Sequence, residues 1–316
     1  MVRLLAERFA FGLLTLLVIS LIVFVGTEIL PGDVVEAVLG QGAREVDVAA
    51  IRRQLGLDRP APERYLQWLT ALITGDLGGR SIASGRAIAD IVSERLPQTL
   101  ALASATAAVA VPLSLCLGLI AALRPGSWID RGITTATVVL LSAPEFLLGT
   151  VLVIFFAVRL RWLPAVSYAS EPTVFFDHFR SMALPVMTLT AAVIAPMTRM
   201  TRSAMLSVLA SPAIEMAVLK GLSRSRIILR HAFKNALPPI ITVIALNLGY
   251  LVTGVVVVEV IFNYPGLAKV LAEAVGARDI PVVQTCAMIF CSAYVVLNLA
   301  ADMLALAANP RRRYPK

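Results

Sequence analysis

Six long apolar stretches divide the chain, and the segments between them carry most of the charge. They cover residues 9–30, 98–123, 133–158, 182–200, 237–262 and 283–308. Crossing a hydrocarbon core of about 30 Å takes about 20 residues of helix, so each stretch is long enough. Pro185 and Pro196 interrupt the fourth, but a membrane helix tolerates proline as a kink. The pattern predicts an all-α polytopic membrane protein with six transmembrane helices.

Composition supports a membrane protein and excludes several other classes. The chain has 316 residues, of which 58% are hydrophobic and 15% charged. A soluble domain has about 45–50% apolar and about 25% charged residues. Disordered, collagenous, coiled-coil and disulfide-rich chains are excluded by the same values. The first stretch is too long for a signal-peptide core and lacks a small-x-small cleavage site, so we expect a retained anchor.

Lys and Arg predict the orientation of the spans. With the N-terminus in the cytoplasm, the inner segments carry 15 basic residues and three acidic ones. The outer segments carry 13 of each, mostly in the segment 31–96, which is too long to count for the positive-inside rule. Without it the outer loops hold only five basic residues. We therefore expect an N-in, C-in topology, which also explains the net charge of +8 without nucleic acid.

The outer segment 31–97 has its own helical pattern. Residues 51–57 are apolar at helical spacing, and an apolar stripe at i, i+3, i+4, i+7 and i+8 runs from Tyr65 and Trp68 to Ile73. The segment 75–79 then breaks the helix. One interpretation is short amphipathic helices on the membrane surface. The other is a docking platform for an extracytoplasmic partner, with Tyr65, Trp68 and Asp76 as candidate contacts, and the two are compatible.

The inner segment 201–236 holds nearly half of the inner positive charge. A short apolar helix around Glu215 is followed by Gly221, a residue type that commonly ends helices. A basic helix with Arg224, Arg226 and Arg230 comes next. The segment is either a basic loop that only fixes orientation or a protruding helix that inserts into a groove on a cytoplasmic partner.

These motifs resemble one known family. Glu215-Met216-Ala217 followed by Gly221 resembles the EAA-x3-Gly loop of ABC importer permeases, although Met216 replaces the middle alanine. The chain resembles the first permease of the dipeptide/oligopeptide/nickel branch, which carries a long outer segment. The matching motifs run from end to end of the chain: Pro31-Gly32-Asp33, Leu55-Gly56-Leu57-Asp58-Arg59-Pro60, Gly75-Asp76-Leu77-Gly78, Glu94-Arg95-Leu96-Pro97, Gly126-Ser127-Trp128-Ile129-Asp130-Arg131, Trp162-Leu163-Pro164-Ala165, His231-Ala232-Phe233-Lys234-Asn235-Ala236-Leu237-Pro238 and Glu259-Val260-Ile261-Phe262-Asn263-Tyr264-Pro265-Gly266-Leu267.

The resemblance implies a transport subunit of the bacterial plasma membrane that catalyses no reaction and holds no cofactor or metal. The sequence has no G-x-x-x-x-G-K-[ST] loop for nucleotide phosphates, so ATP hydrolysis is expected on separate subunits. The expected partners are membrane lipid, a second homologous permease, two cytoplasmic ATP-binding subunits and an extracytoplasmic substrate-binding protein. The coupling role falls on Glu215, Met216, Ala217, Lys220, Gly221, Leu222 and Ser223.

The resemblance also implies a division of the chain and a class of solute. We expect a tail and first helix at 1–30, an outer segment at 31–97, a core permease domain at 98–310 that contains the coupling loop 201–236, and a basic tail at 311–316. Peptides are the first expected solute, with nickel or metal chelates as the alternative. A stand-alone carrier or channel would typically need more helices or an inverted repeat, and a membrane enzyme would need a catalytic cluster that the sequence does not show.

Polar groups within the spans are candidates for the translocation pathway. Glu145 lies 14 residues from both Arg131 and Arg159, so in a straight helix it is about 21 Å from either one, near the midplane. A carboxylate there costs about 2.5–3.5 kcal/mol and is expected to face the bundle interior or water. Glu145 is therefore expected either to line the pathway, where it favours a cationic group, or to make a structural hydrogen bond to another helix.

Other polar and small residues of the spans have less specific roles. Asn247, Thr253 and Asn298 are further pathway candidates, and the two asparagines are also expected to bond between helices. Glu259 and Asp302 are expected to be structural, paired with interfacial arginines or the partner permease. Small residues that allow close helix packing or sliding are Gly118, Gly249 and Gly254.

Overall fold

The computed structural model describes residues 2–29, 58–77, 79–167 and 175–308, and these are almost entirely helical. The expected helix at 51–57, the motif at 31–33 and the tail at 311–316 lie outside them. The helices are α1 (Val2–Ile29), α4 (Ala61–Thr74), α5 (Ile88–Leu123), α6 (Trp128–Ser142), α7 (Glu145–Leu152), the π-helix η1 (Val153–Arg159), α8 (Phe175–Leu209), α9 (Pro212–Leu219), α10 (Arg224–Arg226), the π-helix η2 (Ile227–Ala232), α11 (Phe233–Ile261), α12 (Leu267–Ala277) and α13 (Ile280–Ala308).

Five helices are long and apolar enough to cross a membrane, and a sixth span is broken. The five are Ala6–Ile29, Ile88–Leu123, Phe179–Leu209, Arg224–Val252 and Ile280–Leu304. The sixth pairs α6 with α7 and η1 across a bend of 106°. The expected span over 133–158 is therefore present only as two helical parts that meet at this bend. Ala143 is extended (φ −87°, ψ 127°) because the ring of Pro144 disfavours helical backbone at the residue before it.

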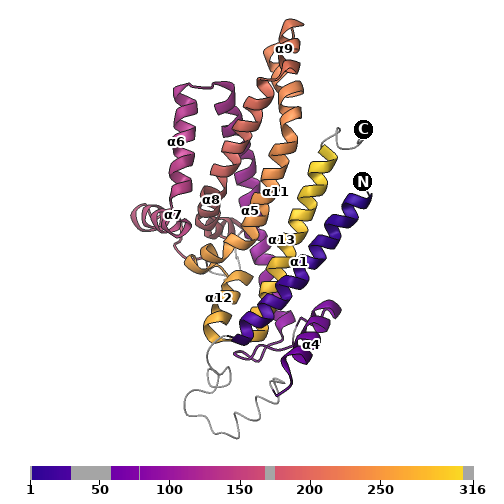
Figure 1. Cartoon of the computed structure of the whole chain (residues 1–316). Helices are drawn as coiled ribbons and strands as arrows, with labels where there is room; N and C mark the ends of the chain where they lie inside the picture. The colour runs from indigo at the N-terminus through magenta and orange to yellow at the C-terminus, as the bar shows by residue number, and fades with distance from the viewer. Residues whose placement is uncertain (1, 30–57, 78, 168–174, 309–316) are drawn as a thin grey trace.

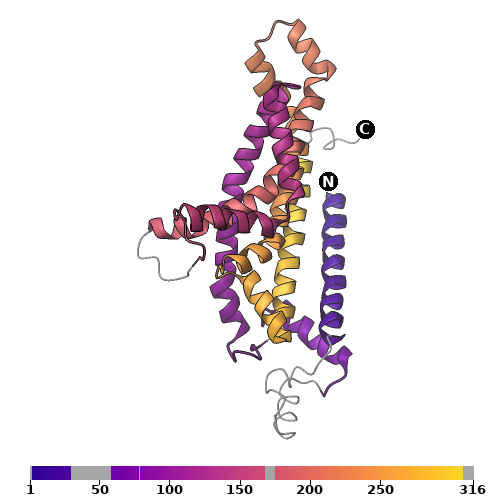
Figure 2. The same cartoon turned by 90° about the vertical axis from the view of Figure 1, so that its left-hand side faces the viewer.

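The helices form an elongated bundle in which α5, α8, α11 and α13 are central (Figure 1). Helix α6 packs on α5 and α8, and α1 lies along α13 at the edge. Both termini lie on the α9 side of the bundle, and α4 and α12 lie at the opposite end, in agreement with an even number of crossings. Figure 2 shows α9 at the tip of two helices that project beyond the rest.

The inner segment 201–236 is mostly a continuation of membrane helices rather than a loop. Helix α8 has 35 residues and continues nine residues beyond the expected end of the fourth span. On the return, the helical path resumes at Arg224 and runs through η2 into α11, with Pro238 and Pro239 inside the helix. At about 1.5 Å per residue, α8 alone is about 52 Å long, longer than the bilayer core is thick. The end of this long helix carries α9 beyond the rest of the bundle.

Close contacts between small residues hold the central helices together. A Cβ at Gly118 of α5 would lie 2.6 Å from Cβ of Thr201 on α8, and one at Gly249 of α11 would lie 3.1 Å from the ring of Tyr294 on α13. At Gly254 the nearest atoms belong to Tyr250 of the same helix. Gly118 and Gly249 therefore let two helices approach closely, as small residues do in membrane bundles.

An ion pair fixes the turn between α5 and α6 to α8. Arg202 donates from Nε and Nη2 to the two carboxylate oxygens of Asp130 at 2.6 and 2.7 Å. The amide of Gly126 donates to the same carboxylate, and the Ser127 hydroxyl accepts from the Asp130 amide as an N-cap. Asp130 is 3% exposed. Two charge-assisted bonds in this geometry constrain the α9 end of the bundle.

At the outer end, Glu259 is buried at the start of α12. Its carboxylate accepts from the Thr99 hydroxyl at 2.7 Å and from the Lys269 amide at 2.9 Å. The expected structural role is therefore found, but the hydrogen bonds come from a hydroxyl of α5 and from the N-terminus of α12 rather than from an arginine. Gly266 provides the space for this carboxylate. Burial raises the pKa of the neighbouring Tyr264 to about 12, so its phenol stays protonated and donates to the carbonyl of Gln98.

Candidate functional site

The short helix α9 (Pro212–Leu219) is a two-turn helix held by two buried side chains. Ile214 and Ala217, one turn apart, are 6% and 7% exposed and pack with Met205 of α8 and Ile240 of α11. The helix begins with Ser211 as N-cap and Pro212 in the first turn, three residues before the expected start at Glu215. Ala217, expected to contact a partner, is instead one of the two anchors.

Gly221 ends this helix, as the sequence predicts. Its φ is +73°, a conformation that L-residues other than asparagine and aspartate rarely adopt. The Gly221 amide donates to Val218 O at 2.9 Å, and the Leu222 amide donates to Ala217 O at 3.3 Å. This pair of bonds is a Schellman motif, with Leu222 packed against the same apolar cluster. A Cβ at Gly221 would meet nothing within 4 Å, so its backbone conformation, rather than close approach within the chain, requires glycine.

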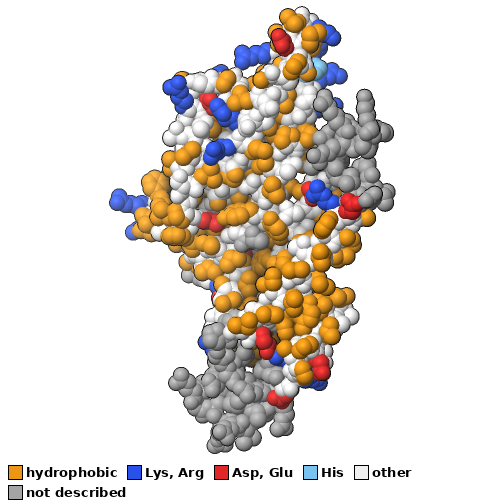
Figure 3. Space-filling view, in the orientation of Figure 1, with side chains coloured by type: hydrophobic (Ala, Val, Ile, Leu, Met, Phe, Trp, Pro, Cys, Tyr) orange, Lys and Arg blue, Asp and Glu red, His pale blue; other side chains and the backbone are white. Residues whose placement is uncertain are grey.

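The remaining side chains of α9 form an exposed apolar face. Met216, Val218 and Leu219 are 54%, 59% and 75% exposed. Glu215 and Lys220 are exposed beside them, and Lys and Arg side chains gather around this end of the molecule (Figure 3). Val218 and Leu219 are not among the coupling residues expected from the sequence. Because Ile214 and Ala217 identify the inner face, helical spacing alone places these two outside.

Leu222 and Ser223 connect α9 to the returning helix. Leu222 is half-buried, whereas Ser223 is exposed and its carbonyl accepts the Ile227 amide at 3.0 Å. The expected coupling residues are thus adjacent in space, with Ala217 and Leu222 directed inward and Glu215, Met216 and Lys220 directed outward. The segment is therefore a short, capped helix that packs on α8 and α11, and not an irregular loop.

Glu145 lies at the bend between α6 and α7. The Tyr250 hydroxyl of α11 donates to one of its carboxylate oxygens at 3.3 Å. Its Oε1 is buried without a hydrogen-bond partner among the described residues. The expected midplane depth was calculated for a straight helix, whereas the 106° bend lies at this residue. The contact with Tyr250 is an interhelical bond that the sequence could not reveal, because 105 residues separate the pair.

The two candidate asparagines bond within their own helices. The amide nitrogen of Asn247 donates to Val243 O at 2.8 Å, and that of Asn298 to Tyr294 O at 3.1 Å. These two hydrogen bonds lie within α11 and within α13, whereas hydrogen bonds between helices were expected for both asparagines. Thr253 lies in α11, and its side chain is outside the described part of the structure.

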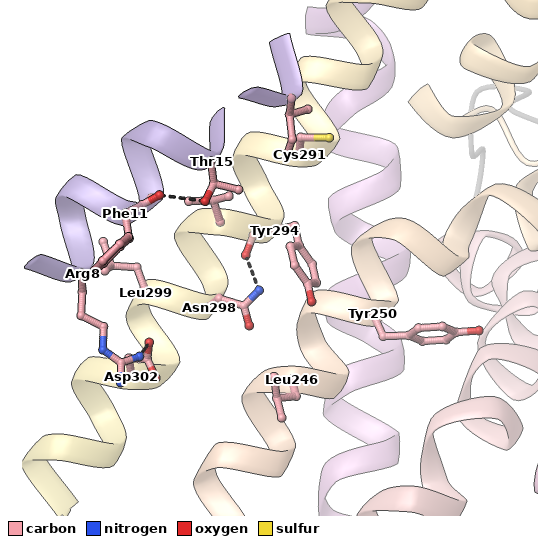
Figure 4. A pocket seen from close by; sticks show the side chains of 13 residues that line it. Arg8, Phe11, Thr15, Leu246, Tyr250, Cys291, Tyr294, Asn298, Leu299 and Asp302 are labelled. Atoms are coloured by element: carbon pink, nitrogen blue, oxygen red, sulfur yellow. Dashed lines mark hydrogen bonds and ion pairs between the residues drawn. The ribbon is translucent and has the colours of Figure 1, made fainter. Parts of the chain in front are cut away.

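A groove of about 970 Å³ runs between α1, α11 and α13 (Figure 4). Asn298 lines it, whereas Glu145 and Asn247 are not among its lining residues. Arg8 and Asp302 form an ion pair at one end, which confirms an arginine partner for Asp302. Three polar residues that line the groove, Thr15, Tyr250 and Tyr294, were not predicted from the sequence as pathway candidates. Polar groups that line a groove of a membrane bundle are rarely left facing lipid.

The apolar stripe of α4 faces the bundle at Tyr65, Trp68 and Leu72, whereas its last residue, Ile73, is exposed. Trp68 is 9% exposed and lies with Tyr65 against Phe24 of α1, with ring centroids 5.4–6.2 Å apart. The Tyr65 hydroxyl is 2.9 Å from the Ser20 hydroxyl. These two candidates for docking are therefore covered within the chain, whereas Asp76 is exposed after the end of α4.

The described residues contain no group of three or more His, Cys, Asp or Glu that could hold a metal ion. The candidate site residues thus form an exposed apolar face on α9, a groove lined partly by polar groups, and a carboxylate at the bend between α6 and α7.

Family models match nearly the whole chain. Residues 114–314 match the binding-protein-dependent transport system inner membrane component, and residues 1–103 match the N-terminal membrane component of the same transport systems. An inward-facing structure of the MetNI methionine ABC transporter has a TM-score of 0.55 over 69% of this chain and 96% of that one, at 16% identity. At this identity the likeness concerns the fold alone.

Curated relatives cover the chain from end to end. The probable peptide ABC transporter permease protein y4tP of Sinorhizobium fredii is 34% identical over 296 residues, 94% of each chain. The glutathione transport system permease protein GsiC of Escherichia coli K12 is 36% identical over 300 residues, 95% of each chain. The chain therefore belongs to the inner membrane components of binding-protein-dependent transport systems, as a multi-pass permease subunit of an ABC importer.

Proposed function

We propose that α9 is the element through which this permease is driven by a separate ATPase. The supporting observation is the exposed apolar face of Met216, Val218 and Leu219 on a helix that is rigidly anchored from behind. Three large apolar side chains at the tip of a projection would be costly in water, and a helix-in-groove contact covers such a face. The permease supplies no bond cleavage of its own, because the nucleotide is hydrolysed on the other subunit.

The assembly follows from this contact. The chain pairs with a second, homologous permease and two ATP-binding subunits on the α9 side, which is cytoplasmic, with both termini inside. A substrate-binding protein docks at the opposite end, where Asp76 is exposed and α4 and α12 lie. Closure of the ATPase pair displaces α9, and α8 and α11 transmit this movement into the bundle as rigid bodies.

The solute pathway forms between the two permeases, along polar groups at the bend and in the groove of this chain. Glu145 with Tyr250, together with Tyr294 and Asn298 of the groove, supply such groups. A peptide or a related small solute is the proposed cargo, because relatives of this chain are named for peptide and glutathione transport. A metal chelate is the alternative, and the Glu145 carboxylate favours a cationic group in either case.

The docking face is tested by placing a charge on it. Leu219→Asp puts a carboxylate at a 75% exposed apolar position, so the chain should insert and fold normally but lose the ATPase subunit on co-purification. Solute-stimulated ATP hydrolysis in proteoliposomes should fall with it.

Ile73→Asp is the matched control. Ile73 is 77% exposed, but it lies on α4 at the other end of the molecule, so ATPase binding should be unchanged. Retention of the ATPase by Leu219→Asp, with normal stimulated hydrolysis, would remove the basis of the proposal.

A further inference from the structure

The segment 145–162 forms a lateral arm, made of α7, η1 and the three residues after them. It leaves the bundle at the 106° bend, and Figure 2 shows it projecting sideways, almost perpendicular to the bundle helices. Helix α6 has 15 residues and a length of about 22 Å, so the arm starts beyond the middle of a hydrocarbon core of about 30 Å.

The arm is firmly seated along one side. Gly149 is buried, and a Cβ there would lie 3.3 Å from Thr188 of α8 and 3.5 Å from the ring of Phe262. At its far end, the guanidinium of Arg180 on α8 donates to the carbonyl of Trp162 at 2.6 and 2.9 Å. These contacts fix the direction of the arm relative to the bundle.

The other side of the arm is exposed and predominantly apolar, and the hydroxyl of Thr150, its one exposed polar side chain before Arg159, bonds to the carbonyl of Phe146. Residues 146–158 contain no charged side chain. Six large apolar side chains are each 45–61% exposed: Phe146, Leu147, Val151, Ile154, Phe155 and Val158. The exposed residues Arg159, Arg161 and Trp162 follow at once, and Figure 3 shows an orange protrusion with blue side chains at its end. Trp162 is 61% exposed.

We propose that this arm is an in-plane anchor that binds phospholipid of the outer leaflet. Its apolar side lies against acyl chains, and Arg159 and Arg161 contact headgroup phosphate. The arrangement has the order that a membrane interface requires, with a run of hydrocarbon-compatible side chains followed by tryptophan and arginine at the headgroup level. The charge of the two guanidinium groups is complementary to phosphate, whereas a protein partner would require no such pair at the end of an apolar helix.

Nitroxide depth measurements test the in-plane direction. Spin labels are placed at Leu147, Val151 or Val158 in the complete transport complex, with the accessible Cys116 and Cys291 changed to serine. The vesicles contain phosphatidylcholine and phosphatidylglycerol. Collision with oxygen should exceed collision with a water-soluble nickel chelate at all three positions, and their depths should agree within a few ångströms. A helix that crosses the bilayer would instead give about 16 Å between positions 147 and 158.

Two results would overturn the proposal. One is a depth gradient of that size, and the other is low collision with both reagents, which would mean that the second permease covers the arm. Since the complex must be intact for the measurement, either result leaves the proposed coupling function standing.

Substitution of the basic end tests headgroup contact. In the double variant Arg159→Gln and Arg161→Gln, the nitroxide at Val158 should move several ångströms deeper, because the side chains no longer hold the end of the arm at the phosphates. Arg131→Gln, an exposed arginine at the start of α6, is the control and should leave the depth unchanged. An unchanged depth in the double variant would refute the phosphate contact.

Discussion

Gly221 gives a prediction whose size can be worked out from its surroundings. Its φ of +73° costs an ordinary L-residue about 1–2 kcal/mol. A Cβ there would meet no atom within 4 Å, so no steric term is added. Gly221→Ala should therefore open the end of α9 about 5–30-fold more often. Gly221→Asn should be nearly neutral, because asparagine visits this conformation.

Hydrogen exchange measures this effect directly. The amides of Gly221 and Leu222 close the Schellman motif, so their exchange should accelerate about 5–30-fold in the alanine variant and little in the asparagine variant. Solute-stimulated ATP hydrolysis should weaken in the same order. If alanine and asparagine variants exchange at the same rate as the wild type, the capping geometry does not stabilise α9 and the reasoning is refuted.

Three further predictions concern the bundle and the pathway. Gly266→Ala would place a methyl group on the Glu259 carboxylate and should lower the free energy of unfolding by at least about 3 kcal/mol. Gly276→Ala, in α12 with open space around it, should leave the unfolding midpoint in a thermal assay unchanged or raise it. Arg202→Gln leaves the buried Asp130 carboxylate poorly paired and should cost about 3 kcal/mol, whereas Arg131→Gln should cost less than about 0.5; equal unfolding midpoints would contradict the clamp. Glu145→Gln should reduce uptake of cationic solutes more than that of neutral ones, and unchanged uptake of both would exclude a pathway role.

Much of the helical architecture is predictable because it follows from local physics. Runs of apolar residues predicted the spans, and Gly221 predicted the end of α9. The sequence also contains a signal for the broken span, because Pro144 restricts the backbone of Ala143. A proline alone, however, does not distinguish a kink from a 106° bend. Pro185 and Pro196 carry the same signal and stay inside a continuous α8.

The contacts of the site were harder to predict because they depend on distant residues. The stripe of Tyr65 and Trp68 was recognised, but periodicity does not tell whether it faces another protein or α1. The Glu145–Tyr250 and Thr99–Glu259 hydrogen bonds join residues that only the tertiary fold brings together. Sequence patterns thus predicted where the helices lie and where α9 ends, whereas the tertiary packing determines which of their side chains face outward.

The central claim is that α9 is the contact with a separate nucleotide-hydrolysing subunit. A cysteine at Leu219, the most exposed apolar residue of that helix, should form a short-range cross-link to the ATPase subunit in the assembled transporter, at a yield that changes when ATP is bound. A cysteine at Ile73, equally exposed at the outer end, should form none. An intact complex in which position 219 forms no cross-link to the ATPase in any nucleotide state would contradict the account.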